Sequence, residues 1–390
     1  MAKVLRILGT RGVPAGHGGF ETFAEHLALH LVARGWQVIV YCQGERSGPV
    51  QLDGWQGVRR VHIGVDESGP RGTIVFDWRA TLHARRAHAA EPGVCLTLGY
   101  NTAVFCALLR SAGIPNLINM DGIEWRRHKW SATAKAWFWL NDWAGCWLGD
   151  HLVADHPEIA RHLATRVGTR KTTTIVYGAD RLSALPETAV RERGLEPGRY
   201  LTLVARPEPE NSILEVVQGF SRHPRGLPLV VLGHYDSGNA YHRAVQTAAS
   251  SEVRFLGAIY DKAVVQALRF HSTAYVHGHQ VGGTNPSLVE ALGAGNAVIA
   301  HDNRFNRWVI GEGGRYFRDA DSFAAVLDTL LAAQSAQSAQ SAQSAQSAWP
   351  AMRGASRARF EAAFTWDRVL GNYEALLTRY VPAPSRRRST

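Results

Sequence analysis

The sequence predicts an α/β protein made of two doubly wound, parallel-sheet domains that face each other across a cleft. Short apolar runs alternate with helix-like stretches through the first half of the 390-residue chain. A second series of the same kind begins at residue 200, and the segment 180–200 between them is polar, contains two prolines and has no strand-like run. Open parallel sheets bind ligands beyond the carboxyl ends of their strands, so the cleft is the expected ligand site.

The first domain is expected to span residues 1–182. Its helix-like stretches include 21–35 and the tryptophan-rich 135–147, both with apolar residues at helical spacing. Its strand-like runs are, in chain order, 4–10, 36–43, 94–100, 116–122 and 151–156.

The second domain is expected to span residues 198–365. Segments 211–220 and 261–270 have the periodicity of helices that cover a sheet. The strand-like runs are 200–205, 227–233, 253–258, 273–278 and 296–300.

The end of the chain has three distinct parts. A three-residue repeat of Gln, Ser and Ala at 332–348 has a period that fits neither a buried helix nor a buried strand, so we expect an exposed extension of the preceding helix or a flexible linker. Amphipathic helix resumes at 357–380, and a final helix at 366–381 is expected to pack back toward the first domain. The basic tail 382–390 is predicted to be disordered.

Composition and charge limit the classes of function. The net charge is +10, but its Arg clusters are scattered and no nucleic-acid-binding motif joins them, so we expect no nucleic-acid partner. No segment has the features of a signal peptide or a membrane span. None of the four cysteines forms a C-x-x-C pair. A reducing, cytoplasmic location is therefore expected.

The tryptophan-rich segment leaves two interpretations open. Trp139, Trp143 and Trp147 lie four residues apart and follow the basic stretch 125–130. Such a helix can rest in the headgroup layer of an anionic membrane, which would make the protein peripheral at the inner face of the plasma membrane. An aromatic row at helical spacing is more often part of a domain core, and this second interpretation is favoured.

The stretch 277–300 predicts an anion site. Gly282 and Gly283 allow the backbone to approach a ligand, Asn285 is a preferred N-cap residue, and Pro286 suits the first helical position. The helix start would face a phosphate group with its unpaired amides, while Glu290, one turn later, can accept hydrogen bonds from sugar hydroxyls. This combination indicates a site for a nucleotide-diphosphate sugar. An ordinary strand-loop-helix connection is the alternative.

A second glycine-rich turn opens a helix in the first domain. Gly18 and Gly19 would bring backbone amides near a ligand, and Arg11 or His17 could reach phosphate or acceptor groups. Glu21 lies in the first helical turn and is either a structural cap or a ligand contact. The turn has neither the dinucleotide-binding spacing nor the Walker lysine.

Asp121 and Glu124 are the candidate catalytic carboxylates, because they follow a predicted strand in NMDGIEW. A capping aspartate in a turn before Gly122 is the alternative. His277, His279 and His301 lack a nearby carboxylate or cysteine, so we expect no metal site. His279 is interpreted as a hydrogen-bonding group of the donor pocket and His128 as facing solvent or acceptor.

Four segments carry a family resemblance: 9–28, 98–105, 119–131 and 276–306. Along essentially its whole length the chain resembles retaining glycosyltransferases of the GT-B fold in family four, and more closely a bacterial rhamnosyltransferase-like subgroup with an amino-terminal domain of the DUF1972 type. The resemblance implies transfer of a sugar from a nucleotide donor to a saccharide hydroxyl. The donor in that subgroup is commonly dTDP-rhamnose, and the acceptor is often linked to lipid diphosphate.

The resemblance also implies roles for individual residues. Glu290 matches a glutamate that holds the donor ribose, and Arg206 matches an arginine that contacts the donor diphosphate. The glutamate and the lysine that accompany them in relatives are replaced here by Gly282 and Asn211. The backbone amides of Gly283 and Thr284 would therefore supply more of the diphosphate binding.

The expected function is metal-independent glycosyl transfer without a cofactor, in the assembly of cell-surface polysaccharide. Two alternatives remain at this stage. The donor can be another nucleotide sugar, such as UDP-glucose or UDP-N-acetylglucosamine, or the chain can be a catalytically inactive nucleotide-sugar-binding protein.

Overall fold

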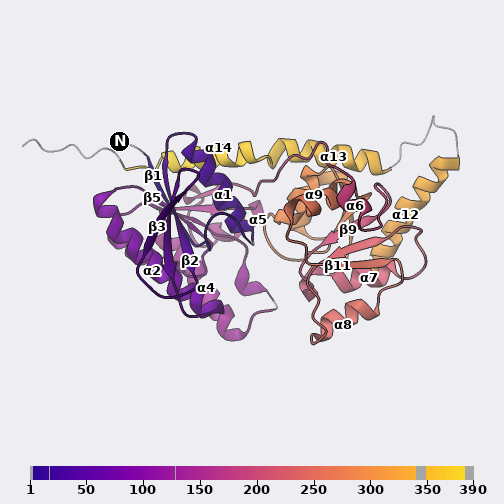
Figure 1. The fold of residues 1–390 in the computed structure, drawn as a ribbon, viewed down its shortest axis with the longest axis horizontal. Coiled ribbons are helices and arrows are strands. Elements are labelled where there is room, and N and C mark those ends of the chain that lie inside the picture. The colour runs from indigo at the N-terminus through magenta and orange to yellow at the C-terminus, as the bar shows by residue number, and fades with distance from the viewer. Residues whose placement is uncertain (1–2, 17, 128, 340–347, 383–390) are drawn as a thin grey trace, which may run out of the picture. The chain divides into compact units, whose positions relative to one another are not determined.

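The computed structural model of the protein describes residues 3–16, 18–127, 129–339 and 348–382. The chain divides into two compact units, the first made of residues 1–176 and 366–390 and the second of residues 177–365. Each unit has its own sheet and core (Figure 1).

The first unit contains an eight-stranded sheet in the order β3-β4-β2-β1-β5-β6-β7-β8. The strand pairs are parallel except for the β3–β4 hairpin. The strands are β1 (Val4–Leu8), β2 (Gln37–Gly44), β3 (Gln51–Trp55), β4 (Val58–Gly64), β5 (Val94–Leu98), β6 (Asn116–Asn119), β7 (His151–Ala154) and β8 (Thr172–Thr174).

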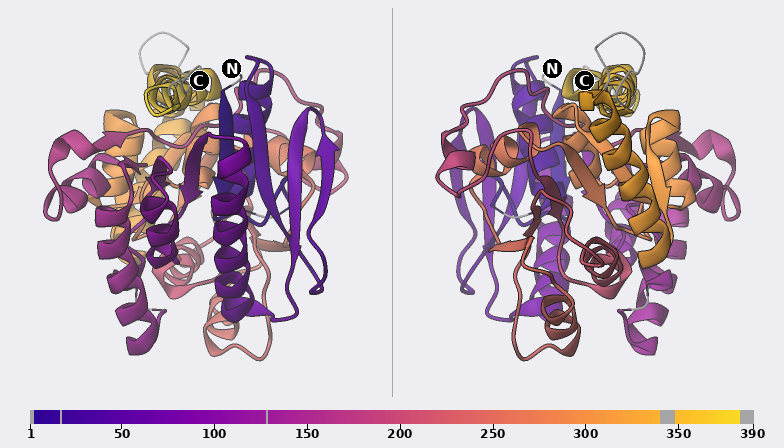
Figure 2. Two further views of the ribbon diagram at one scale, coloured as in Figure 1. Left: turned by 90° about the vertical axis from the view of Figure 1, so that its left-hand side faces the viewer. Right: turned by 90° about the vertical axis from the view of Figure 1, so that its right-hand side faces the viewer.

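Helices cover this sheet because their apolar faces bury against it. Helix α2 (Gly69–Ala90) runs alongside the strands and contacts β1 and β4 (Figure 2, left). Helix α14 packs on α1, where the Phe23 and Tyr373 rings lie 4.6 Å apart. The helices are α1 (Gly19–Val32), α2 (Gly69–Ala90), α3 (Ala107–Ser111), α4 (Ala132–Leu148), α5 (Pro157–Ala164) and α14 (Trp366–Thr378), with short 3-10 turns η1 (Ala103–Cys106), η2 (Glu124–Arg126) and η3 (Thr169–Lys171).

The second unit contains a six-stranded, wholly parallel sheet in the order β11-β10-β9-β12-β13-β14. Its central strands are buried on both faces, as the continuous apolar runs predict. The strands are β9 (Leu201–Val204), β10 (Leu229–Leu232), β11 (Val253–Gly257), β12 (Ala274–His277), β13 (Ala297–His301) and β14 (Arg315–Phe317).

The helices of the second unit continue the alternation. They are α6 (Thr188–Arg191), α7 (Ile213–Phe220), α8 (Ala240–Thr247), α9 (Lys262–Phe270), α10 (Pro286–Gly293), α11 (Arg304–Ile310), α12 (Ala320–Ala339) and α13 (Ala348–Ala363), with 3-10 turns η4 (Pro209–Asn211) and η5 (Gly311–Gly313). The described part of the Gln-Ser-Ala repeat, up to Ala339, continues α12 as a helix. Residues 340–347 of the repeat, and 383–390 of the tail, lie outside the described residues.

The predicted fold class is confirmed: two doubly wound, parallel-sheet units, with the last helix packed in the amino-terminal unit. Within the stretch 357–380, predicted as amphipathic helix with a final helix from 366, α13 and α14 are separated by Phe364 and Thr365. Thr365 forms a bridge with Ala179, and this pairing draws the backbone out of the helical conformation. Among the described residues, no helix has the length and hydropathy needed to cross a bilayer.

Candidate functional site

The loop between β12 and α10 has the local structure that its sequence predicts. Asn285 caps the helix, its side-chain oxygen accepting a hydrogen bond from the Ser287 amide at 3.0 Å, and Pro286 occupies the first helical position. Gly282 has φ of +135°, a value that favours glycine. Gly283 and Thr284 lie directly before the cap, and the Thr284 side chain is buried. Helix α10 therefore begins directly after a tightly turned, glycine-containing loop.

The loop after β9 packs against the β12–α10 loop. The Gln280 amide donates to the Glu210 carbonyl at 2.9 Å. A Cβ on Gly278 would lie 2.0 Å from the Asn211 carbonyl oxygen, so the two backbones pass too closely for any larger residue. Because β9 and β12 are neighbours in the sheet, the two loops meet at its carboxyl edge. This contact brings Arg206 and Asn211 to the same edge as Gly282, Gly283, Thr284 and Asn285.

Arg206 and Asn211 differ in what their side chains do. Arg206 is exposed, and its guanidinium has no hydrogen-bond or ion-pair partner within the described part of the chain. Asn211 is buried, and its amide donates to the Arg206 carbonyl at 2.8 Å. Asn211 thus fixes the loop that presents Arg206.

Glu290 belongs to a buried polar network. Its carboxylate pairs with Arg269 at 2.5 Å, while the same guanidinium donates to the Ser287 hydroxyl at 2.7 Å. Ser287 also hydrogen-bonds the Tyr275 hydroxyl at 2.6 Å, and that hydroxyl donates to the Val204 carbonyl at 3.2 Å. The Arg269 side chain is only 5% exposed and that of Glu290 38% exposed. The Glu290 carboxylate is therefore held by the buried Arg269 guanidinium and is still partly exposed to solvent.

Arg269 was not predicted from the sequence as a site residue. It lies near the end of α9, where a helix-periodic stretch ending in an exposed cation is the ordinary expectation. A buried Arg is stable only when it is paired, and the paired partner is the predicted Glu290. No signal in the sequence connects the two positions.

The three histidines of this edge lie at strand ends and in the loop between them: His277 ends β12, His279 follows it and His301 ends β13. His277 and His279 stack with ring centroids 4.4 Å apart. His277 is buried, and neither ring nitrogen has a hydrogen-bond partner among the described residues. Burial, followed by the charges of His279 and Arg269, holds the pKa of His277 well below its usual value, so the ring is neutral. Within the described ranges, no group of three or more His, Cys, Asp or Glu side chains could hold a metal ion.

In the first unit the glycine-rich turn is held by carboxylates of the helix that it opens. Gly18 is the N-cap of α1 and Gly19 its first residue. The Arg11 amide donates to Glu21 at 3.2 Å, and the Ala15 amide donates to Glu25 at 2.6 Å. The Glu21 carboxylate therefore holds the backbone of the loop at Arg11, while the Arg11 side chain is exposed. His17 lies outside the described residues, as does His128.

The predicted carboxylates Asp121 and Glu124 lie in different environments. Glu124 is 12% exposed, and its two oxygens accept from Arg127 at 2.8 Å and from Trp130 at 2.9 Å. Its backbone amide donates to the Tyr100 hydroxyl at 2.8 Å. Both oxygens of Glu124 are therefore occupied in holding the loop 121–130.

Asp121 is the carboxylate with the stronger signs of a chemical role. It follows β6, and its φ of +50° is unusual for a residue other than glycine. Its amide donates to the Asn119 side chain at 3.0 Å, and Asn119 in turn donates to Tyr373 of α14 at 2.9 Å. Burial, and then the nearby Glu124 charge, raise the pKa of Asp121 to about 6. A carboxyl group that titrates there can exchange a proton near neutral pH.

The glycine-rich turn and the Asp121 loop lie at one edge of the first sheet. A Cβ on Gly99, directly after β5, would lie 3.3 Å from the ring of Phe20, the second residue of α1, which the glycine-rich turn opens. Tyr100, the next residue, bonds the Glu124 amide. The carboxyl ends of β1, β5 and β6, which are adjacent in the sheet, thus gather the predicted residues of this unit.

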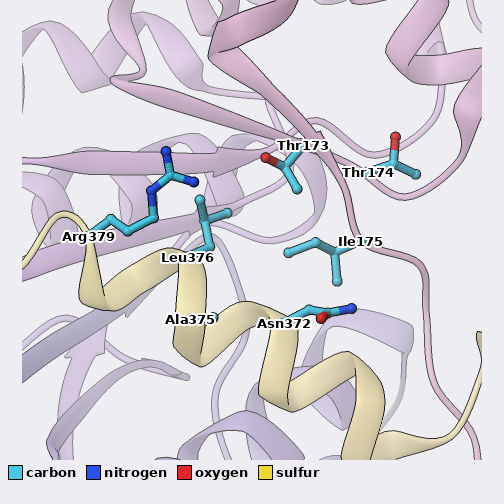
Figure 3. A pocket seen from close by; sticks show the side chains of 7 residues that line it. All are labelled: Thr173, Thr174, Ile175, Asn372, Ala375, Leu376 and Arg379. Atoms are coloured by element: carbon cyan, nitrogen blue, oxygen red, sulfur yellow. The ribbon is translucent and has the colours of Figure 1, made fainter.

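A cavity in the first unit lies away from these residues. It has a volume of about 310 Å³ and lies between β8 and the end of α14 (Figure 3). Its lining residues, which include none of the predicted ones, are Thr173, Thr174, Ile175, Asn372, Ala375, Leu376 and Arg379.

Comparison with solved structures identifies the fold class. The chain is similar to sucrose-phosphate synthase from Thermosynechococcus elongatus, with 18% identity, a TM-score of 0.77 and coverage of 97% of this chain and 98% of that one. It is similar to HepE of Anabaena in complex with UDP, at 12% identity, a TM-score of 0.72 and coverage of 97% and 100%. For α,α-trehalose 6-phosphate synthase from Burkholderia multivorans the values are 13%, 0.68, 97% and 97%.

These structures and the two doubly wound units define the class: the chain has the GT-B fold. More particularly, residues 1–180 match the family DUF1972, described as a domain of unknown function. No curated protein sequence matches the chain.

Proposed function

We propose that this protein is a retaining glycosyltransferase that uses a nucleotide-diphosphate sugar. The observation that carries the proposal is the grouping at the edge of the second sheet: the capped start of α10, the exposed Arg206 guanidinium and the Glu290 carboxylate held by Arg269. A cation and a helix amino terminus bind a diphosphate, and a half-exposed carboxylate accepts hydrogen bonds from ribose hydroxyls. Each part of the donor therefore has a matching group.

The chemistry follows from these groups. Transfer breaks the bond between the anomeric carbon and the diphosphate oxygen and forms a bond between that carbon and the oxygen of the acceptor hydroxyl. Negative charge develops on the departing diphosphate. Arg206 and the α10 amides, including those of Gly283 and Thr284, stabilise that charge. The acceptor hydroxyl loses a proton either to the departing diphosphate or to Asp121, which is proposed as the acceptor-side group. Neither route requires a metal ion, so we expect activity to survive chelation of divalent cations.

The donor is proposed to be dTDP-rhamnose, on the resemblance to the rhamnosyltransferase-like subgroup. A UDP-sugar is the second candidate, favoured by the similarity to HepE, whose structure was solved in complex with UDP. The acceptor is proposed to be a saccharide hydroxyl, carried on a lipid diphosphate at the inner face of the plasma membrane, in polysaccharide assembly.

The test is transfer itself. The protein is incubated with lipid-linked saccharide extracted from bacterial membranes and with dTDP-rhamnose, UDP-glucose or UDP-N-acetylglucosamine in turn, and release of nucleoside diphosphate is followed. We expect release with one donor that depends on the extract and falls at least tenfold in the Arg206→Ala and Glu290→Ala variants. Donor binding without transfer to any acceptor would instead support an inactive binding protein, the alternative raised by Gly282 and Asn211.

A further inference from the structure

Helix α4 presents a row of exposed aromatic residues on the surface of the first unit. The favoured prediction that this row is domain core is wrong, since Trp139 is 49% exposed and Trp147 63% exposed. Leu140 beside them is 49% exposed. We call Trp139, Leu140, Trp143 and Trp147 the tryptophan ridge. Large apolar side chains gathered on one exposed helix face usually mark an interaction surface.

The ridge is an ordered array. Trp139 and Trp143 meet edge to face with centroids 6.1 Å apart, and Trp143 meets Trp147 in the same way at 5.8 Å. The Arg166 guanidinium lies 4.5 Å from the Trp143 ring centroid and fixes the middle of the row. The three indoles are therefore held at the surface rather than being folded inward.

The charges around the ridge are positive. Lys135 precedes Trp139 by one turn on the same row. At the other end the Lys171 ammonium donates to the Cys146 carbonyl at 2.8 Å, and Arg170 beside it is exposed. The single acidic residue of α4, Asp142, is 2% exposed and pairs with Arg166 at 2.8 Å.

Asp150, just beyond the helix, faces Arg110 at 3.8 Å. The exposed Arg170 and the partly exposed Lys135 and Lys171 therefore flank the ridge, while the nearby carboxylates Asp142 and Asp150 already have cationic partners.

We propose that the tryptophan ridge docks the protein on the headgroup layer of an anionic lipid membrane. Indole rings partition to that layer, and flanking cations are attracted to anionic headgroups. A second protein is a poorer fit, because three partly exposed indoles and a leucine offer well under the roughly 800 Å² per partner that a stable protein interface buries.

Docking at this helix has a consequence for the candidate acceptor loop, one that rests on the proposed function. Trp125 donates its indole N–H to Asp142 of α4 at 2.7 Å, and the Trp130 ring lies 5.1 Å from that of Phe138, also on α4. The loop 121–130 is therefore tied to the docking helix at two points. A lipid-linked acceptor would then be held on the same membrane as the segment that carries Asp121.

The test is sedimentation of the full-length protein with two kinds of vesicle, one of phosphatidylcholine alone and one of phosphatidylcholine with about 30% of the anionic phosphatidylglycerol. We expect binding to the anionic vesicles, weakened by salt, and a loss of at least tenfold in the double variant Trp139→Ser/Trp147→Ser. Trp78→Ser is the matched control, because Trp78 is 41% exposed but lies on α2. It should bind as the wild type does.

Three outcomes would overturn the docking proposal: no binding of the wild type to anionic vesicles, undiminished binding of the double variant, or an equal loss in the Trp78→Ser variant. Self-association of the wild type that the double variant abolishes, without vesicle binding, would assign the ridge to a second copy instead. Nucleotide binding measured on the same variants is expected to be unchanged, so failure of the docking proposal and failure of the proposed function are distinguishable.

Discussion

At the scale of single residues, the candidate donor site depends on partners that hold its groups in place. Asn211 binds the backbone of the loop that presents Arg206, and Arg269 fixes Glu290 through a pair at 2.5 Å. A carboxylate already oriented by a buried cation loses less entropy when it accepts ribose hydroxyls. We therefore propose that Arg269 is a positioning residue that acts through Glu290.

Replacing Arg269 should weaken donor binding more than it slows the reaction. In the Arg269→Gln variant we expect KM for the donor to rise about tenfold, equivalent to about 1.4 kcal/mol, with a smaller change in kcat. Arg269→Lys keeps the charge and should recover part of the loss. Steady-state kinetics measure both, and thermal unfolding identifies variants that are merely unstable. A fall in kcat that is equal in the Gln and Lys variants, with an unchanged KM, would contradict the positioning role.

From the raised pKa of Asp121 we expect the stability of the fold to fall with rising pH and the transfer rate to increase. Its folded-state pKa, about 6, lies above the ordinary 3.8, so the folded protein holds this proton more tightly than the unfolded chain does. Ionisation of Asp121 therefore lowers the free energy of unfolding as the pH rises from 3.8 to about 6, and the loss is complete above that range. Asp121→Asn should raise the unfolding midpoint relative to the wild type at pH 7.5 and not at pH 4.

If Asp121 accepts the acceptor proton, wild-type transfer should rise with pH through an apparent pKa near 6. The Asn variant should then lose roughly a hundredfold or more of its rate, the usual size of a general-base effect. A pH–rate profile of the two proteins measures this. A variant that keeps the wild-type profile would leave the departing diphosphate as the proton acceptor.

At the scale of elements, the start of α10 combines a helix cap with the proposed anion site, and the two roles can be separated. Asn285→Asp keeps a good capping residue and adds a negative charge beside the position expected for the diphosphate. We expect an unchanged unfolding midpoint and nucleoside diphosphate binding weakened at least tenfold, measured by calorimetry. Asn285→Ser is the control that caps without charge and should bind normally. Equal binding by both variants would argue against a diphosphate at this helix.

The elements that the sequence predicted are those with long apolar runs. The predicted strand segments contain β1, β5, β6 and β7 of the first sheet and β9 to β12 of the second, and they match β2 and β13 except for the last residue of each strand. The β3–β4 hairpin was missed because β3 is exposed along most of its length and contains Gly54. Strand β8 was missed because it consists of three threonines at the edge of the sheet.

The candidate site was predictable only where local sequence determines local structure. The Asn285 cap and the Pro286 helix start follow from neighbouring residues. The Arg269–Glu290 pair, the use of both Glu124 oxygens by Arg127 and Trp130, and the exposure of the tryptophan ridge depend on packing between segments distant in the chain. Periodicity gives the face of a helix but does not say whether that face is covered.

At the scale of the whole molecule, two units of like architecture carry different kinds of groups. The carboxyl edge of the second sheet has a cation, a capped helix start and a carboxylate, which suit a nucleoside diphosphate. The edge of the first sheet has Asp121, whose pKa is raised to about 6 by burial and by the charge of Glu124, and the same unit has an exposed aromatic helix face. We propose this division of labour, with the donor groups in the second unit and the acceptor groups in the first.

Its most direct test is the thermal stability of the protein with dTDP, UDP, GDP and ADP, because a ligand that binds the folded state raises the unfolding midpoint. We expect a rise in the unfolding midpoint with dTDP or UDP that is lost in Arg206→Ala and Glu290→Ala. The rise should be kept in Arg191→Ala, whose side chain is 62% exposed in a surface pair with Glu187. No rise with any nucleotide, or the same rise in all three variants, would contradict it.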